Sequence, residues 1–141
     1  VTGYRGYEHN QVQPLFPFGY GLAYTTFSYS GLEVKVDDRN KGDVTVRFSV
    51  RNDGKREGAE VVQLYVSDPK SGESRPVKEL KGFEKVNLKP GETQTVTLKL
   101  TQDDFSYFSS KKRKWVFEKG DFVIRVGASS QDIRLEETIR L

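Results

Sequence analysis

The chain has 141 residues, a length that fits one domain able to bury about 70% of the surface its unfolded form exposes. Its 23 basic residues nearly balance its 20 acidic ones, and the net charge of +3 gives no electrostatic footprint for nucleic acid. No apolar run approaches the roughly 20 residues of a membrane span. The absence of cysteine excludes disulfides, thiolate metal sites and a cysteine nucleophile.

The chain contains no methionine and begins at Val1, without the apolar stretch of a secretory signal. We therefore expect it to be part of a longer protein. Residues 1–26 are rich in aromatic residues, proline and glycine and show no alternation of apolar and polar positions. This composition is too aromatic for a flexible linker, and we predict an ordered lead-in arm over residues 1–26.

The run LFPFGYGLAYTTF (residues 15–27), which spans the end of the arm and the first residue of the next strand, combines five aromatic rings with two glycines and no charge. An apolar patch of this size would be a liability on the surface of a monomer. We expect the rings to pack in a core or in a groove between two bodies. The alternative is a direct contact with sugar, because pyranoses dock their apolar faces on flat rings.

Alternation with a period of two predicts a series of strands after the arm. A first strand is expected over 27–36, and in the next Val44, Val46, Phe48 and Val50 share one face. The following strand is apolar on both faces, so we predict that it is central and covered on two sides. Pro90 and Gly91 suit the centre of a type II turn. The predicted strands in this half cover residues 27–36, 43–52, 59–68, 78–88 and 93–100.

The last third of the chain contains a short aromatic segment, DDFSYF, followed by two more alternating runs. We predict a hairpin in which residues 114–118 pair with residues 121–128 across a turn at Lys119 and Gly120. A final strand over 132–141 would point Ile133, Leu135 and Ile139 inward.

No segment shows the 3.6-residue apolar stripe of a helix, and turn residues recur about every ten residues. The predicted fold is therefore all-β: an antiparallel β-sandwich over residues 27–141 with an irregular N-terminal arm. The single tryptophan, Trp115, comes late in the chain and no cysteine pair brackets it. These features favour a fibronectin type III-like domain over an immunoglobulin domain proper.

The polar residues give little support to catalysis by this chain. The two members of each acidic doublet would point to opposite faces of a strand, so that none of the three doublets converges on one substrate atom; the doublets are Asp37/Asp38, Asp103/Asp104 and Glu136/Glu137. The lone His9 lacks partners for a triad or a zinc site. The Gly19-Tyr20-Gly21 motif lacks the strand and helix of a phosphate loop. We predict no catalytic residue, no metal and no cofactor.

The basic run KKRKW, residues 111–115, has two interpretations. A polyanion would be attracted to four adjacent positive charges. The interpretation we favour is an exposed loop that leads into the last hairpin, with Trp115 turning into the core; an anionic polysaccharide remains the alternative ligand.

Several motifs in the same order resemble one known domain. PLFPFGYGLAYTTFSYSGL resembles the segment that leads into the C-terminal fibronectin type III-like domain of glycoside hydrolase family 3 enzymes, chiefly β-glucosidases. GYRGYEH resembles a stretch further upstream in that family, although Gly6 stands where an aromatic residue is usual. VRNDGKREGAEVVQLYVSDP, VKELKGFEKVNLKPGETQTVTLKL and FVIRVGASSQDIRL also resemble this domain, so that the resemblance covers nearly the whole chain.

The resemblance implies a parent enzyme in which an N-terminal barrel supplies an aspartate nucleophile and an α/β domain usually supplies a glutamate acid/base. The parent would hydrolyse terminal β-D-glucosyl residues with retention, through a covalent intermediate; a β-xylosidase or related β-glycosidase is the alternative. No catalytic residue can be carried onto this chain, which resembles a structural accessory domain. A secreted or periplasmic location is slightly favoured by the resemblance, and a cytoplasmic one stays open.

Two functions of different classes follow from these observations. In the first, the domain docks on the barrel and α/β domains and stabilises them through the arm. In the second, it is a carbohydrate-binding module that holds polysaccharide through Tyr20, Tyr24, Trp115 or the basic run; a dimer contact through the apolar surface is a weaker third. The predicted docking residues are Tyr4, Arg5, Tyr7, Phe16, Pro17, Phe18, Gly19, Tyr20, Gly21 and Tyr24.

Overall fold

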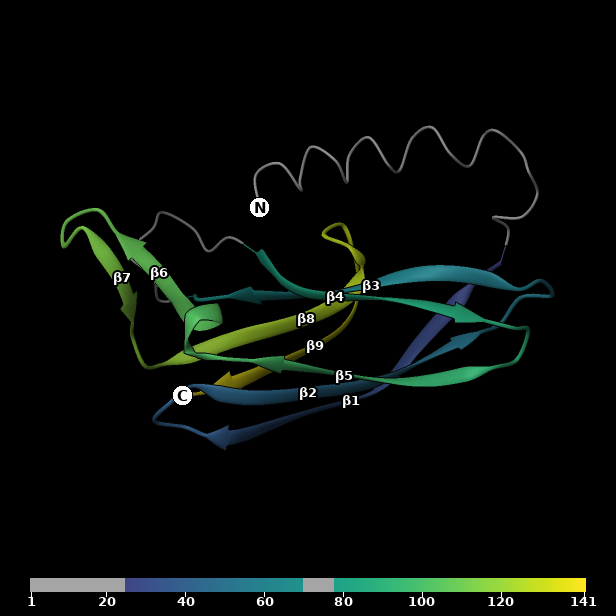
Figure 1. Ribbon diagram of the computed structural model, residues 1–141, viewed down its shortest axis with the longest axis horizontal. Coiled ribbons are helices and arrows are strands. Elements are labelled where there is room, and N and C mark those ends of the chain that lie inside the picture. Colours follow the sequence, from purple (N-terminus) through teal and green to yellow (C-terminus); the bar gives the residue numbers. More distant parts are fainter. Residues whose placement is uncertain (1–24, 70–77) are drawn as a thin grey trace.

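The computed structural model describes residues 25–69 and 78–141. Within these residues, two antiparallel sheets face each other in a sandwich, and a separate two-stranded hairpin extends beyond one end of it (Figure 1). One sheet has the strand order β1-β2-β5 and the other β4-β3-β8-β9. The strands are β1 (Phe27–Asp38), β2 (Asp43–Asn52), β3 (Gly58–Ser67), β4 (Glu79–Leu88), β5 (Thr93–Leu100), β6 (Ser106–Ser109), β7 (Lys114–Phe117), β8 (Asp121–Ser129) and β9 (Asp132–Arg140).

The predicted fold class is confirmed. The only helical element in the described residues is a single 3₁₀ turn, η2 (Gln102–Phe105), and none of the described segments is a helix long and apolar enough to span a membrane. The predicted turn is also present: Gly91 has a φ of +79°, and the amide of Glu92 donates to the carbonyl of Lys89 at 2.9 Å. Only glycine adopts such a φ without steric cost.

Strand β1 contains a bulge that keeps its apolar residues on the inner face. Gly31 has a φ of +67°, and the register with β2 shifts between Ser30 and Glu33. The extra residue changes the phase of the alternation, so that Tyr29 before the bulge and Leu32 after it both pack against the core.

The core lies between the two sheets and is built from the inward positions of the alternating strands. The predicted inner face of β2 is confirmed, since Val44, Val46, Phe48 and Val50 are at most 1% exposed. The facing sheet contributes fully buried side chains from β3, β4 and β8: Val62, Leu64, Val86, Leu88, Phe122, Ile124 and Val126. Residues from two sheets therefore interdigitate, as in other aligned sandwiches.

Strand β3 is central, as its two apolar faces predicted. It pairs with β4 on one side and with β8 on the other. Gln63 and Tyr65 point away from the inner core, yet they are only 4% and 3% exposed. The Tyr65 hydroxyl donates to the Gln63 side chain, whose amide donates to the carbonyl of Ala128 at 2.9 Å, so these buried polar groups are hydrogen-bonded.

The predicted hairpin between residues 114–118 and 121–128 is wrong. Strand β7 pairs with β6, whereas β8 pairs with β3 and β9. The prediction rests on the Lys119-Gly120 pair, which is typical of a hairpin turn. Gly120 does not close a tight turn, because its amide and carbonyl form a bridge with Leu141 at 3.1 and 2.8 Å. The chain thus passes from the hairpin into the sandwich at this point.

Candidate functional site

All ten predicted docking residues, together with His9, belong to residues 1–24 and lie outside the described part of the chain. Their role as docking residues therefore stays a prediction. The structure does describe the junction at which the arm meets the sandwich, starting at Thr25.

Thr25 is held in a socket formed by the end of β2 and the loop that follows it. Its hydroxyl donates to Oδ1 of Asn52, and this oxygen also accepts the amide of Gly54 at 2.8 Å. A Cβ atom on Gly54 would lie 2.2 Å from the Thr25 hydroxyl, and one on Gly58 would lie 2.4 Å from its methyl group. Glycine is therefore required at both positions, because Thr25 lies too close to them for a Cβ atom. The junction is tightly packed.

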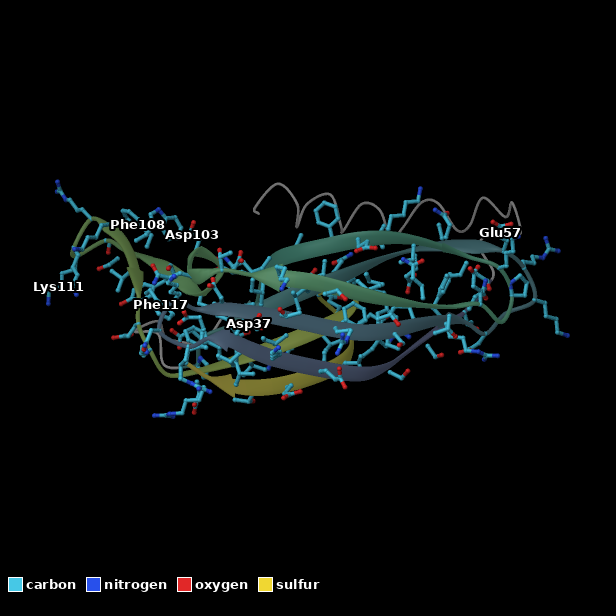
Figure 2. All side chains as sticks on the ribbon, turned by 60° about the horizontal axis from the view of Figure 1, so that its bottom comes forward. Asp37, Glu57, Asp103, Phe108, Lys111 and Phe117 are labelled. Atoms are coloured by element: carbon cyan, nitrogen blue, oxygen red, sulfur yellow. The ribbon has the colours of Figure 1, made fainter. Side chains whose placement is uncertain are left out.

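The acidic doublets lie at the end of β1, in η2 and on the edge strand β9. Asp38 accepts the amide of Lys41 at 3.0 Å, Asp104 accepts the amide of Thr101 at 2.8 Å and Glu136 pairs with Arg125 at 3.1 Å. Asp103 is exposed in η2, and Figure 2 shows it far from Glu57 at the opposite end of the molecule. In residues 25–69 and 78–141, no three His, Cys, Asp or Glu side chains gather as a metal site would need.

Sequence reasoning missed a polar cluster at the edge where β1 lies against β9. The Tyr29 hydroxyl donates to Glu60 Oε2 at 2.9 Å, and the Arg134 guanidinium lies 5.1 Å from the centre of the Tyr29 ring. Arg134 also donates to both oxygens of Asp132, at 2.6 and 3.0 Å, and to the carbonyl of Phe27 at 2.9 Å. Asp132 and Arg134 share a face because they are two residues apart on a strand, and this spacing was the available signal.

The cluster perturbs the titration of its members. Burial is the main cause that raises the pKa of Glu60 above its ordinary value, and it also raises that of Tyr29, with Glu60 adding to the effect. The hydrogen bonds from Arg134 hold the pKa of Asp132 below its ordinary value. The four side chains join strands of both sheets, so we interpret the cluster as a polar latch that closes this edge of the sandwich.

The hairpin of β6 and β7 carries the residues that the sequence singled out as KKRKW. Lys111, Lys112 and Arg113 are exposed in its tip (Figure 2 labels Lys111 at this end). The predicted burial of Trp115 is wrong: the residue is 66% exposed, because β7 belongs to the projecting hairpin and not to the sandwich. Trp115 lies opposite Phe108, with the ring centres 5.7 Å apart in an edge-to-face arrangement.

A cleft of about 330 Å³ separates this hairpin from the end of the sandwich. Its lining combines aromatic rings from the hairpin with carboxylates from the sandwich and η2. The lining includes Asp68, Glu79, Asp104, Phe108 and Trp115.

The arrangement of the two sheets defines the class of the domain as a fibronectin type III-like sandwich, and the family comparison agrees. A family model described as "Fibronectin type III-like domain" matches residues 60–130. The chain belongs to this family.

The most informative relatives are β-glucosidases. The chain is 49% identical to thermostable β-glucosidase B of Acetivibrio thermocellus over 99% of its length, and 45% identical to a β-glucosidase of Bacteroides ovatus over 95%. It spans 19% and 18% of the lengths of these two proteins. The chain thus corresponds to about one fifth of the curated relatives that it matches.

Solved structures give the same result. The β-glucosidase D2-BGL of Chaetomella raphigera matches 97% of this chain with a TM-score of 0.77 and 41% identity, and the chain covers 22% of that structure. The family 3 β-glucosidase of Bifidobacterium adolescentis matches 84% of the chain with a TM-score of 0.77 and 38% identity, over 17% of its own chain. These identities support a shared domain and not only a shared fold.

Proposed function

We propose that the chain is a non-catalytic accessory domain of a glycoside hydrolase family 3 β-glucosidase and that it braces the catalytic barrel and α/β domains. The parent would hydrolyse terminal β-D-glucosyl residues with retention of configuration. The observation that carries the proposal is the extent of the match: nearly the whole chain aligns with one fifth of a β-glucosidase.

Two features of the described residues support a bracing role. The acidic doublets are held in turns and ion pairs, whereas glycoside hydrolysis needs two carboxyl groups facing each other across the scissile bond. The packed socket around Thr25 holds this residue, at the end of the arm, against the sandwich. A junction held in this way favours docking in one orientation, because less conformational entropy is then lost on contact.

The test uses the 141-residue chain in place of the matching segment of thermostable β-glucosidase B. We expect the purified chain alone to hydrolyse no aryl β-glucoside. We expect the chimera to be active and to keep its activity at temperatures where the same enzyme truncated before this segment has lost it. Turnover by the isolated chain would refute the non-catalytic role, and equal thermal inactivation of chimera and truncated enzyme would refute bracing.

A further inference from the structure

The cleft between the β6–β7 hairpin and the sandwich has two chemically different walls. Its volume of about 330 Å³ falls at the lower end of the range for small-molecule sites. One wall is aromatic and comes from the hairpin, and the other carries the carboxylates of Asp68, which follows β3, of Glu79 on β4 and of Asp104 in η2. Phe105 and Phe122, both at most 3% exposed, close the cleft on the core side.

The aromatic wall follows from the register of the hairpin. Ser106 pairs with Phe117 and Phe108 with Trp115, so these four side chains share one face. Phe117, at the base, packs against the core. Phe108 and Trp115, further out, line the cleft while remaining 52% and 66% exposed. Large flat rings held this way can receive the apolar face of a pyranose, because few degrees of freedom are lost on contact.

The opposite wall supplies hydrogen-bond acceptors. Asp68, Glu79 and Asp104 all line the cleft. The orientation of Asp104 is fixed by the amide of Thr101, at 2.8 Å, and Glu79 lies 3.4 Å from the ammonium group of Lys81. Carboxylates accept hydroxyl hydrogen bonds strongly. Their negative charge would repel a uronic acid, so the wall favours a neutral sugar.

We propose that this cleft binds one or two units of a neutral oligosaccharide of β-linked pyranoses with equatorial hydroxyl groups. Such a ring has a flat apolar face that can stack on either Trp115 or Phe108, whose planes stand at 73° to each other, and hydroxyl groups at its rim for Glu79 and Asp104. The proposal goes beyond bracing and is independent of it. The competing explanation is that the Phe108–Trp115 pair only stabilises the hairpin, as cross-strand aromatic pairs do.

The chain offers a direct reporter, because Trp115 is its only tryptophan. We expect titration of the 141-residue chain with cellotetraose to give a saturable change in tryptophan emission in the millimolar range. Calorimetry should give the same midpoint. An oligogalacturonate of equal length should give no saturable change at the same ionic strength.

Variants assign the binding to the cleft. Phe108→Leu keeps an apolar side chain opposite Trp115 but removes a flat ring, and we expect binding about tenfold weaker, equivalent to losing a stacking contact. Glu79→Gln should also weaken binding. Phe83→Ala is the matched control, since Phe83 is 64% exposed on β4 and does not line the cleft. Amide exchange of Tyr107 and Val116 shows whether the hairpin stays paired in each variant.

Three results would overturn the proposal. The first is the absence of a saturable response to cellotetraose in the wild-type chain. The second is an equal loss of binding in Phe83→Ala and Phe108→Leu, or preferential binding of the oligogalacturonate. The third is that the truncated β-glucosidase body protects Trp115 emission from quenching by acrylamide, whereas cellotetraose does not. The hairpin would then be a protein-docking element. None of these results bears on the chimera experiment.

Discussion

Asn52 is a fully buried amide whose side chain is hydrogen-bonded at both of its polar atoms. Its Nδ2 donates to the carbonyls of Arg56 at 2.8 Å and Leu88 at 2.9 Å, while Oδ1 accepts from Thr25 and Gly54. The residue therefore connects the junction with the arm to the ends of β2 and β4. In a low-dielectric interior, such a satisfied network holds one arrangement of the chain, because each alternative leaves polar groups unpaired.

We expect Asn52→Ala to lower the free energy of unfolding by about 3 kcal/mol, since buried groups left without a partner cost about 1–3 kcal/mol each. Chemical denaturation of the 141-residue chain measures the loss. Asn87→Ala is the matched control, because Asn87 lies exposed on β4 and surface changes are usually within about 0.5 kcal/mol. Similar losses in the two variants would contradict the role assigned to the network.

Glu60 gives the polar latch a dependence on pH. Because burial raises its pKa, the folded chain binds this proton more tightly than the unfolded chain. The stability contributed by the group is fully present below the unfolded pKa of about 4.3 and is lost as pH rises through the higher folded pKa. Glu60→Gln keeps an acceptor for the Tyr29 hydroxyl but cannot ionise.

The melting temperature of Glu60→Gln, relative to wild type, should therefore increase between pH 4 and pH 8. Glu60→Ala serves as the comparison, because it leaves the Tyr29 hydroxyl without its partner and should be less stable than Glu60→Gln at every pH. Parallel melting curves for wild type and Glu60→Gln across this pH range would show that the carboxylate does not titrate differently on folding.

At the scale of elements, the β6–β7 hairpin lies outside the two sheets of the sandwich. It forms its own two-stranded sheet, and isolated hairpins are marginally stable in water. Its tip contains Arg113 with a φ of +54°, the only positive φ at a non-glycine residue in the described segments. A left-handed conformation costs about 1–2 kcal/mol at a residue with a Cβ atom.

We expect Arg113→Gly to stabilise the hairpin by about 0.5–1 kcal/mol, after subtraction of the larger entropy of glycine in the unfolded chain. The measurement is the hydrogen exchange of the Tyr107 and Val116 amides, which should slow. Lys112→Gly is the control, because Lys112 has no positive φ to relieve, and it should speed exchange. Faster exchange in both variants would show that the strain at Arg113 is not limiting.

The hairpin also marks where prediction from sequence failed, and the reason is physical. Alternation identified the strands of the sandwich because their inner faces are buried, as in β2 and β3. It could not identify the partner of β7, because β7 has a neighbouring strand on each side in sequence and alternation does not say whether it pairs with β6 or with β8. Glycine is typical of turns, yet Gly120 forms its two backbone hydrogen bonds with Leu141, which is 21 residues away in the chain. The placement of Trp115 failed with it.

The candidate sites show the same limit. The Asp132/Arg134 spacing shows a shared face, but Tyr29 and Glu60 reach that face from other strands. The cleft joins residues from β3, β4, η2, β6 and β7, and no local pattern connects these segments. Motif order, in contrast, was sufficient to recognise the family, because the family pattern already contains the long-range packing that one sequence does not show.

At the scale of the whole molecule, the sandwich has its own core between two sheets, yet it corresponds to one fifth of its relatives. Interfaces between domains of one chain typically bury about 600–1,500 Å². The sequence places the apolar material for such an interface in the arm, and the socket at Thr25 holds the end of the arm against the sandwich.

We therefore expect Phe16→Ala and Phe18→Ala, each made in the chimera with β-glucosidase B, to lower its inactivation temperature while leaving the KM for an aryl β-glucoside unchanged. Truncating a buried phenylalanine costs about 3–5 kcal/mol in a core. Thr95→Ala, an exposed position on β5, is the control. If both phenylalanine variants have the same inactivation temperature as the control, the arm does not hold the domain to the enzyme. If the KM rises instead, the arm acts on substrate binding and not on stability.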